Sequence, residues 1–94
     1  GFTAQPTAAG RSHFADLDFS AFPPILGYNK VAARKECPVL LTVPQTGDPL
    51  VATGAFGQGR VLAYMSDPAP HWGCNFVFWE QYATFWLTCL TQIL

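Results

Sequence analysis

The most regular pattern of apolar and polar positions lies at the C-terminal end of the chain. Over residues 76–94, apolar side chains recur every three or four positions, with a narrow polar stripe between them. This spacing predicts an amphipathic helix that is buried on most sides, with Asn75 placed to cap its N-terminus. The polar stripe interrupts the apolar run, which excludes a membrane span of about 20 residues. The apolar positions are Phe78, Trp79, Tyr82, Phe85, Trp86, Cys89, Leu90 and Ile93, and the polar ones are Glu80, Thr84, Thr88 and Thr91.

The middle of the chain has the pattern of β-strands. Residues 38–43 form a short apolar and β-branched run that is closed by Pro44, which predicts a strand. Residues 50–56 and 60–66 are two β-prone runs around the loop Gly57-Gln58-Gly59, which predicts a β-hairpin. Gly54 and Ala63 within these strands indicate a close neighbour on that face.

The first third of the chain has little regular pattern. Residues 1–11 are small and polar, and we interpret them as a loop or linker. Two prolines exclude helix in the loop-like run of residues 22–29. Such a long irregular stretch, together with 50% hydrophobic and 12% charged residues in only 94 positions, is typical of a segment that lies against a larger body. The chain begins with Gly1 rather than Met. We therefore expect the apolar surface to be covered, either by the remainder of its own polypeptide or by a partner subunit. We also expect the protein to form a homo-oligomer.

Charge and cysteine content limit the function classes. The net charge is −1 and the five basic residues form no long run, so we expect no nucleic-acid partner. The pair Arg34-Lys35 is interpreted as a solvated strand edge. Three cysteines without paired spacing favour free thiols and a cytoplasmic location. The opening residues show no signal-peptide pattern.

The candidate chemistry lies in residues 66–75, "SDPAPHWGCN", between the hairpin and the C-terminal helix. Two prolines restrict this loop, and so they hold His71 in few conformations. The end of a strand that leads into a helix is a common ligand site in α/β folds, and a neutral histidine there can act as a general base. The alternative is a stiff corner in which His71 and Trp72 only pack.

Other chemistry is less well supported. Cys74 lies three residues after His71, but no nucleophile-elbow pattern surrounds it, so a Cys–His dyad is disfavoured. His13, His71 and the aspartates do not have metal-ligand spacing, and no metal is predicted. The glycines at 57 and 59 precede no helix start, which excludes a phosphate loop. We predict no cofactor.

Two stretches of the sequence resemble a known family. "FPPILGYNKV" (residues 22–31) and "DPLVATGAFGQGRVLAYMSDPAPHWG" (residues 48–73), followed by an aromatic helix, are similar to the C-terminal third of class I glutamine amidotransferase-like proteins. The resemblance extends from Ser12 to the end of the chain. A similar "GRV" strand and loop histidine occur in trehalose-utilisation-like domains.

The resemblance implies a fold and a set of site residues. It implies that residues 1–94 are a single segment, the C-terminal part of a larger flavodoxin-like α/β domain, with a strand, a β-hairpin and a long C-terminal helix. The parallel sheet and the nucleophile would lie upstream of Gly1. His71 takes the position of the catalytic base, but Trp72-Gly73 follow it where the family has Pro and Glu. Asp67 is then the candidate to orient His71.

The function implied is hydrolysis of an amide or related acyl group of a small-molecule substrate. Trp72, Tyr28 and Asn29 are the candidate ligand-binding residues, and the nucleophile is supplied upstream. The rival hypothesis is a non-catalytic ligand-binding or oligomerisation domain that keeps the fold without glutaminase activity. A nucleophile at the upstream elbow would distinguish the two.

Overall fold

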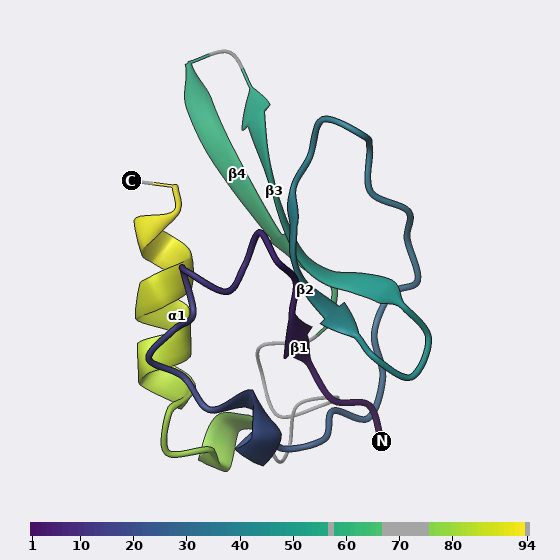
Figure 1. The fold of residues 1–94 in the computed structure, drawn as a ribbon, viewed down its shortest axis with the longest axis vertical. Coiled ribbons are helices and arrows are strands. Elements are labelled where there is room, and N and C mark those ends of the chain that lie inside the picture. The colour runs from purple at the N-terminus through teal and green to yellow at the C-terminus, as the bar shows by residue number, and fades with distance from the viewer. Residues whose placement is uncertain (57, 67–75, 94) are drawn as a thin grey trace.

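The computed structural model describes residues 1–56, 58–66 and 76–93. Within these residues the chain forms a small α/β unit, in which a four-stranded antiparallel sheet lies beside a C-terminal helix (Figure 1). The strands are β1 (Gln5–Pro6), β2 (Val39–Val43), β3 (Asp48–Phe56) and β4 (Gly59–Tyr64). The helices are the 3-10 turns η1 (Phe19–Ala21) and η2 (Phe76–Phe78) and the α-helix α1 (Tyr82–Thr91).

The strands follow one another in the sheet in chain order, β1-β2-β3-β4, and every pair is antiparallel. The predicted hairpin is confirmed, because β3 and β4 pair without interruption from Val51↔Tyr64 to Phe56↔Gly59. The predicted strand at residues 38–43 is confirmed as β2. The turn between β2 and β3 contains Gly47 at a φ of 79°, a left-handed conformation that glycine adopts without steric cost.

The N-terminal segment differs from the loop expected over residues 1–11. Residues 5 and 6 form β1, which pairs with Thr42 and Leu41 of β2. The N–H of Thr7 continues the ladder by donating to the carbonyl of Leu40 at 2.9 Å. A two-residue strand is held by backbone hydrogen bonds and is too short to show a side-chain period, so the sequence pattern could not reveal it.

The core combines aliphatic side chains, such as Leu41 and Leu50 of the sheet, with a cluster of aromatic rings around the helix. Phe85 of α1 is fully buried and lies between the N-terminal segment and the hairpin. Phe14, from the segment that runs alongside α1 in Figure 1, stacks on it at a centroid distance of 5.7 Å. Tyr64 at the end of β4 meets it at 6.2 Å. These contacts join three separate parts of the sequence into one core.

The C-terminal helix is shorter and more exposed than predicted. Residues 76–78 form η2, and α1 begins only at Tyr82, after Gln81, which makes no side-chain capping bond. The reason is a tight turn that seats Trp79 against Phe22 at a centroid distance of 5.2 Å. The predicted cap, Asn75, lies outside the described residues.

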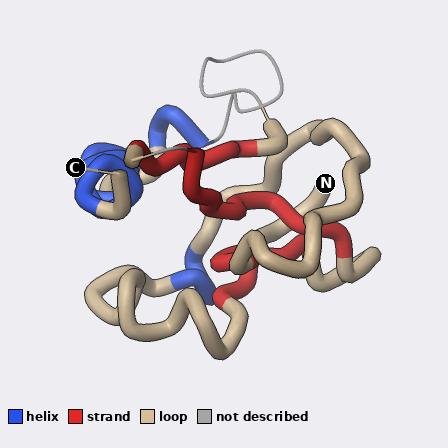
Figure 2. The backbone as a smooth tube through the Cα atoms, turned by 90° about the horizontal axis from the view of Figure 1, so that it is seen from above, coloured by secondary structure: helices blue, strands red, loops and turns tan. Residues whose placement is uncertain are grey.

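The described residues cover one face of α1 and leave another exposed. The buried residues of α1 are Phe85 and Cys89, whereas Leu87 and Leu90 are 64% and 49% exposed. Seen from above in Figure 2, the helix lies to one side of the strands. No helix among the described residues is long and apolar enough to cross a membrane.

Candidate functional site

The predicted catalytic loop begins where β4 ends. Asp67, His71 and Trp72 lie outside the described residues, as does Cys74. The structure does describe the strand end that leads into this loop, Met65 and Ser66. The site is therefore built from the groups around that strand end.

The loop that carries Tyr28 and Asn29 is fastened to this strand end. The backbone N–H of Asn29 donates to the carbonyl of Met65 at 2.6 Å. The hydroxyl of Ser66 donates to the carbonyl of Gly27 at 2.6 Å. These bonds connect residues 27–29 to the last two residues before Asp67, so two of the predicted ligand-binding residues lie beside the start of the predicted catalytic loop.

The side chain of Tyr28 is turned toward the β2–β3 turn. Its hydroxyl donates to Oδ2 of Asp48 at 2.7 Å and lies 2.7 Å from Oγ1 of Thr46. Because the Tyr28 proton is used for Asp48, Thr46 is the donor of the second bond. The ring of Phe2 packs edge-on against the Tyr28 ring at 5.1 Å. Tyr28, Thr46 and Asp48 thus form a polar anchor that fastens the loop to the β2–β3 turn. The Tyr28 hydroxyl is used entirely by these protein partners.

The anchor has defined charge states. The pKa of Asp48 is lowered, mainly by the hydrogen bond from Tyr28. Burial raises this pKa, whereas the hydrogen bond from Thr46 and the charge of Lys30 lower it further. The hydrogen bond with Thr46 acts to lower the pKa of Tyr28, but the hydrogen bond to Asp48, burial and the Asp48 charge together raise it. Near neutral pH the anchor therefore consists of a carboxylate and a protonated phenol.

Lys30 adds a weak contact at the rim of the anchor. Its Nζ lies 4.0 Å from Oδ2 of Asp48, and the lysine side chain is 81% exposed while that of Asp48 is 15% exposed. An ion pair at 4.0 Å whose lysine is this exposed contributes little to stability. The anchor thus depends on the hydrogen bonds of Tyr28 and Thr46.

The two cysteines that the structure describes, Cys37 and Cys89, are packed against other parts of the chain. Burial raises the pKa of the Cys89 thiol to about 12, and Cys89 is only 2% exposed, so it stays a neutral thiol and cannot act as the nucleophile. The sulfur of Cys37 faces Gly54, where an added Cβ would lie 3.3 Å from it. This is the close neighbour that the glycine in β3 predicted.

Sequence reasoning missed Thr46, Asp48 and Ser66 as parts of the site. The sequence pattern gave Thr46 and Asp48 no role, and it placed Ser66 only at the end of a predicted strand. The signal that could have found them is the polar character of three residues near strand ends, but the pattern does not show that the loop at 27–29 returns to them.

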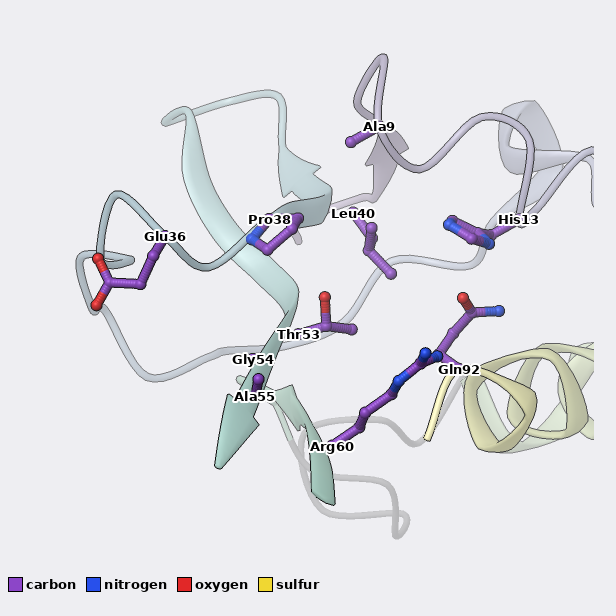
Figure 3. Close-up of a pocket in the computed structure, with 10 residues that line it drawn as sticks. All are labelled: Ala9, His13, Glu36, Pro38, Leu40, Thr53, Gly54, Ala55, Arg60 and Gln92. Atoms are coloured by element: carbon purple, nitrogen blue, oxygen red, sulfur yellow. The ribbon is translucent and has the colours of Figure 1, made fainter. Parts of the chain in front are cut away.

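Two hollows flank the β3–β4 hairpin, and the second one reaches Met65, next to the fastened loop. The first has a volume of about 420 Å³ and includes His13, Arg60 and Gln92 among its lining residues (Figure 3). The second has a volume of about 320 Å³ and is mostly apolar, with Ala52, Val61 and Ala63 among its lining residues. In the part of the chain that the structure describes, no group of three or more histidine, cysteine or acidic residues is placed to hold a metal ion.

Comparison with known proteins identifies the family. The whole chain, residues 1–94, matches the family model described as "Putative glutamine amidotransferase". The chain belongs to this family. The family resemblance expected from the sequence is thereby confirmed, and it extends over the N-terminal residues as well.

Two solved structures are similar to this amidotransferase-like chain. The cytoplasmic protein STM1381 from Salmonella typhimurium LT2 is 39% identical, with a TM-score of 0.86, over 99% of this chain and 37% of that one. The cytoplasmic protein STM3548 from Salmonella typhimurium is 36% identical, with a TM-score of 0.84, over 99% of this chain and 37% of that one. No curated protein matches the sequence significantly. The chain thus spans little more than a third of the length of the solved structures it resembles.

Proposed function

We propose that this protein hydrolyses an amide or a related acyl group of a small molecule, and that residues 65–71 with the loop at 27–29 form one wall of its active site. In this proposal His71 is the general base, Asp67 orients its imidazole, and Trp72 and Asn29 contact the substrate. The nucleophile comes from a part of the polypeptide outside residues 1–94. The surrounding domain is flavodoxin-like, and the protein is cytoplasmic.

The observation that carries the proposal is the attachment of the 27–29 loop to Met65 and Ser66. Two hydrogen bonds of 2.6 Å join the loop to this strand end, and the bond from Tyr28 to Asp48 joins it to the β2–β3 turn. A catalytic histidine needs a rigid surrounding, because a small misplacement costs a large part of the rate. The fastened strand end provides such a support directly before the histidine loop.

A general base at His71 would take the proton of the attacking nucleophile and return it to the leaving amine. The base itself must be within hydrogen-bond reach of the nucleophile. A carboxylate at Asp67 would hold the imidazole in the tautomer that accepts this proton. Family membership supports this reaction class, and the missing Pro-Glu pair after His71 makes Asp67 the residue to test.

The test is turnover by the full-length polypeptide. Ammonia release from glutamine and hydrolysis of a p-nitrophenyl ester are measured for the wild type and for His71→Ala, with Glu80→Ala as a control at an exposed position outside the site. Loss of a general base lowers the rate about 100-fold or more, so His71→Ala should lose that activity while Glu80→Ala keeps it. Equal turnover of the wild type and His71→Ala would refute the role of the histidine.

A second candidate function is assembly without catalysis, and one observation favours it. Leu87 and Leu90 are three residues apart on one face of α1, and both are largely exposed. An exposed apolar stripe of this kind is typical of a surface that packs on another protein segment. In this alternative the stripe contacts the remainder of the polypeptide or a second copy in a homo-oligomer. Size-exclusion chromatography of Leu87→Glu tests it, since the charged variant should fall to a smaller oligomer, whereas an unchanged elution volume would exclude a second copy on the stripe.

A further inference from the structure

We infer that the hollow in Figure 3 binds a small organic carboxylate that also carries a hydroxyl or amino group. This inference goes beyond the proposed function. The hollow lies at the start of β4, whereas the predicted catalytic loop follows its end. From Arg60 to Tyr64 the strand covers about 13 Å at roughly 3.3 Å per residue, so the hollow and the described strand end before Asp67 are at opposite ends of β4.

The cationic group of the hollow is free to bind an anion. Arg60 lies near the start of β4, opposite Ala55 of β3, and its side chain extends toward Gln92 and His13 (Figure 3). Among the described residues the ion pair present is that of Lys30 with Asp48, and Arg60 has no such partner. A guanidinium presents its N–H donors in a planar fork that matches the two oxygens of a carboxylate.

The second polar group of the hollow is an acceptor. The Nε2 of Gln92 donates to the carbonyl of Thr88 at 3.1 Å and to Oγ1 of Thr91 at 3.2 Å. Its Oε1 is the polar atom left for a ligand, and it can accept from a hydroxyl or an amine. The ligand therefore needs an anionic group for Arg60 and a donor group for Gln92.

The remaining lining residues fit a small, partly apolar molecule. The buried Leu40 and the exposed Pro38 and Ala55 line the hollow with apolar atoms. Glu36 lies at the opposite rim, and its carboxylate is directed away from Arg60 and His13 in Figure 3. A volume of about 420 Å³ is within the usual range for small-molecule sites.

The experiment uses the full-length polypeptide labelled with ¹⁵N, and the backbone amide shifts of Thr53, Ala55 and Arg60 are followed. Sodium lactate is the probe. Lactamide replaces its carboxylate by a neutral amide, and propionate removes its hydroxyl. Inorganic phosphate, an anion without a carboxylate, is the fourth titrant. Arg60→Gln removes the proposed anion partner, and Arg34→Gln is the charge-matched control, since Arg34 is exposed and does not line this hollow.

We expect lactate to shift the three amides with an apparent Kd that is lower than that of propionate and at least about tenfold lower than that of lactamide. Charge-assisted hydrogen bonds justify that ratio. Arg60→Gln should weaken lactate binding by about the same factor, and Arg34→Gln should leave it unchanged. Equal loss in both variants, or no lactate shifts in the wild type, would overturn the site. Shifts with phosphate but not lactate would overturn the carboxylate assignment, and equal binding of propionate would overturn the role of Gln92. Each of these results is independent of the turnover of His71→Ala.

Discussion

Phe85 joins the three parts of the chain that form the core, so its removal is the sharpest test of the fold. The substitution Phe85→Ala deletes a ring that is 0% exposed. Six aromatic rings lie around it, those of Phe14, Phe22, Tyr64, Phe76, Trp79 and Trp86, at centroid distances from 5.1 to 6.5 Å.

The expected loss is about 3–5 kcal/mol in the free energy of unfolding, which is the range for a buried phenylalanine replaced by alanine. The upper half of that range is expected, because several edge-to-face contacts are lost together with the buried area. Leu87→Ala on the same helix is the control. Leu87 is 64% exposed, so its truncation should change stability by no more than about 0.5 kcal/mol.

The assay is urea denaturation of the full-length polypeptide, followed by far-UV circular dichroism. If Phe85→Ala does not fold, Phe85→Leu, which retains most of the volume, should fold with a loss of about 1–2 kcal/mol. Equal losses for Phe85→Ala and Leu87→Ala would refute the packing described for α1, because the two positions would then be buried alike.

Two further predictions concern the backbone and the anchor. Gly10→Ala should destabilise by more than about 2 kcal/mol, because the added Cβ would lie 2.0 Å from the carbonyl oxygen of Leu40. Gly47→Ala should cost only about 1–2 kcal/mol for its left-handed backbone, since its Cβ meets nothing within 4 Å; thermal unfolding that ranks Gly47→Ala as the worse variant would contradict this. Folding lowers the pKa of Asp48 from its ordinary value of 3.8. The stability that the Asp48 carboxylate contributes is therefore complete above pH 3.8, and it is lost as the pH falls through the lower pKa of the folded state. Stability curves measured against pH should therefore fall less steeply in acid for Asp48→Asn than for the wild type, and parallel acid limbs would show that the Tyr28 bond is absent.

The sequence pattern was sufficient for the elements whose side chains have a period. The strand predicted at 38–43 followed from an apolar and β-branched run closed by Pro44, and the hairpin predicted at 50–66 followed from two β-prone runs around a glycine-containing loop; the structure has them as 39–43, 48–56 and 59–64. The periodicity of residues 76–94 predicted a helix, but it could not show that Trp79 turns into the core and delays the helix start to Tyr82. That outcome depends on a contact with Phe22, more than fifty residues earlier in the chain, which no local pattern contains.

The candidate site could be predicted only in part, because it too depends on contacts between residues that are far apart in the chain. Tyr28 and Asn29 were found through a family resemblance, and the structure joins them to the strand end before Asp67. The groups that hold this loop are the backbone carbonyl of Met65, the hydroxyl of Ser66 and the side chains of Thr46 and Asp48. Hydrogen bonds of this kind depend on how the chain returns in space, and turn residues such as Thr46 and Asp48 look alike whether or not they anchor a loop.

The most direct test of the proposed site is a double-mutant cycle on the kcat/KM for amide or ester hydrolysis by the full-length polypeptide. Tyr28→Phe removes the hydroxyl that anchors the loop to Asp48, and His71→Ala removes the proposed base. If both act on one site, Tyr28→Phe should lower kcat/KM several-fold in the wild type and have little further effect in the His71→Ala background. Equal, additive effects of Tyr28→Phe in the two backgrounds, or no effect in either, would contradict the proposal that the fastened loop supports the histidine.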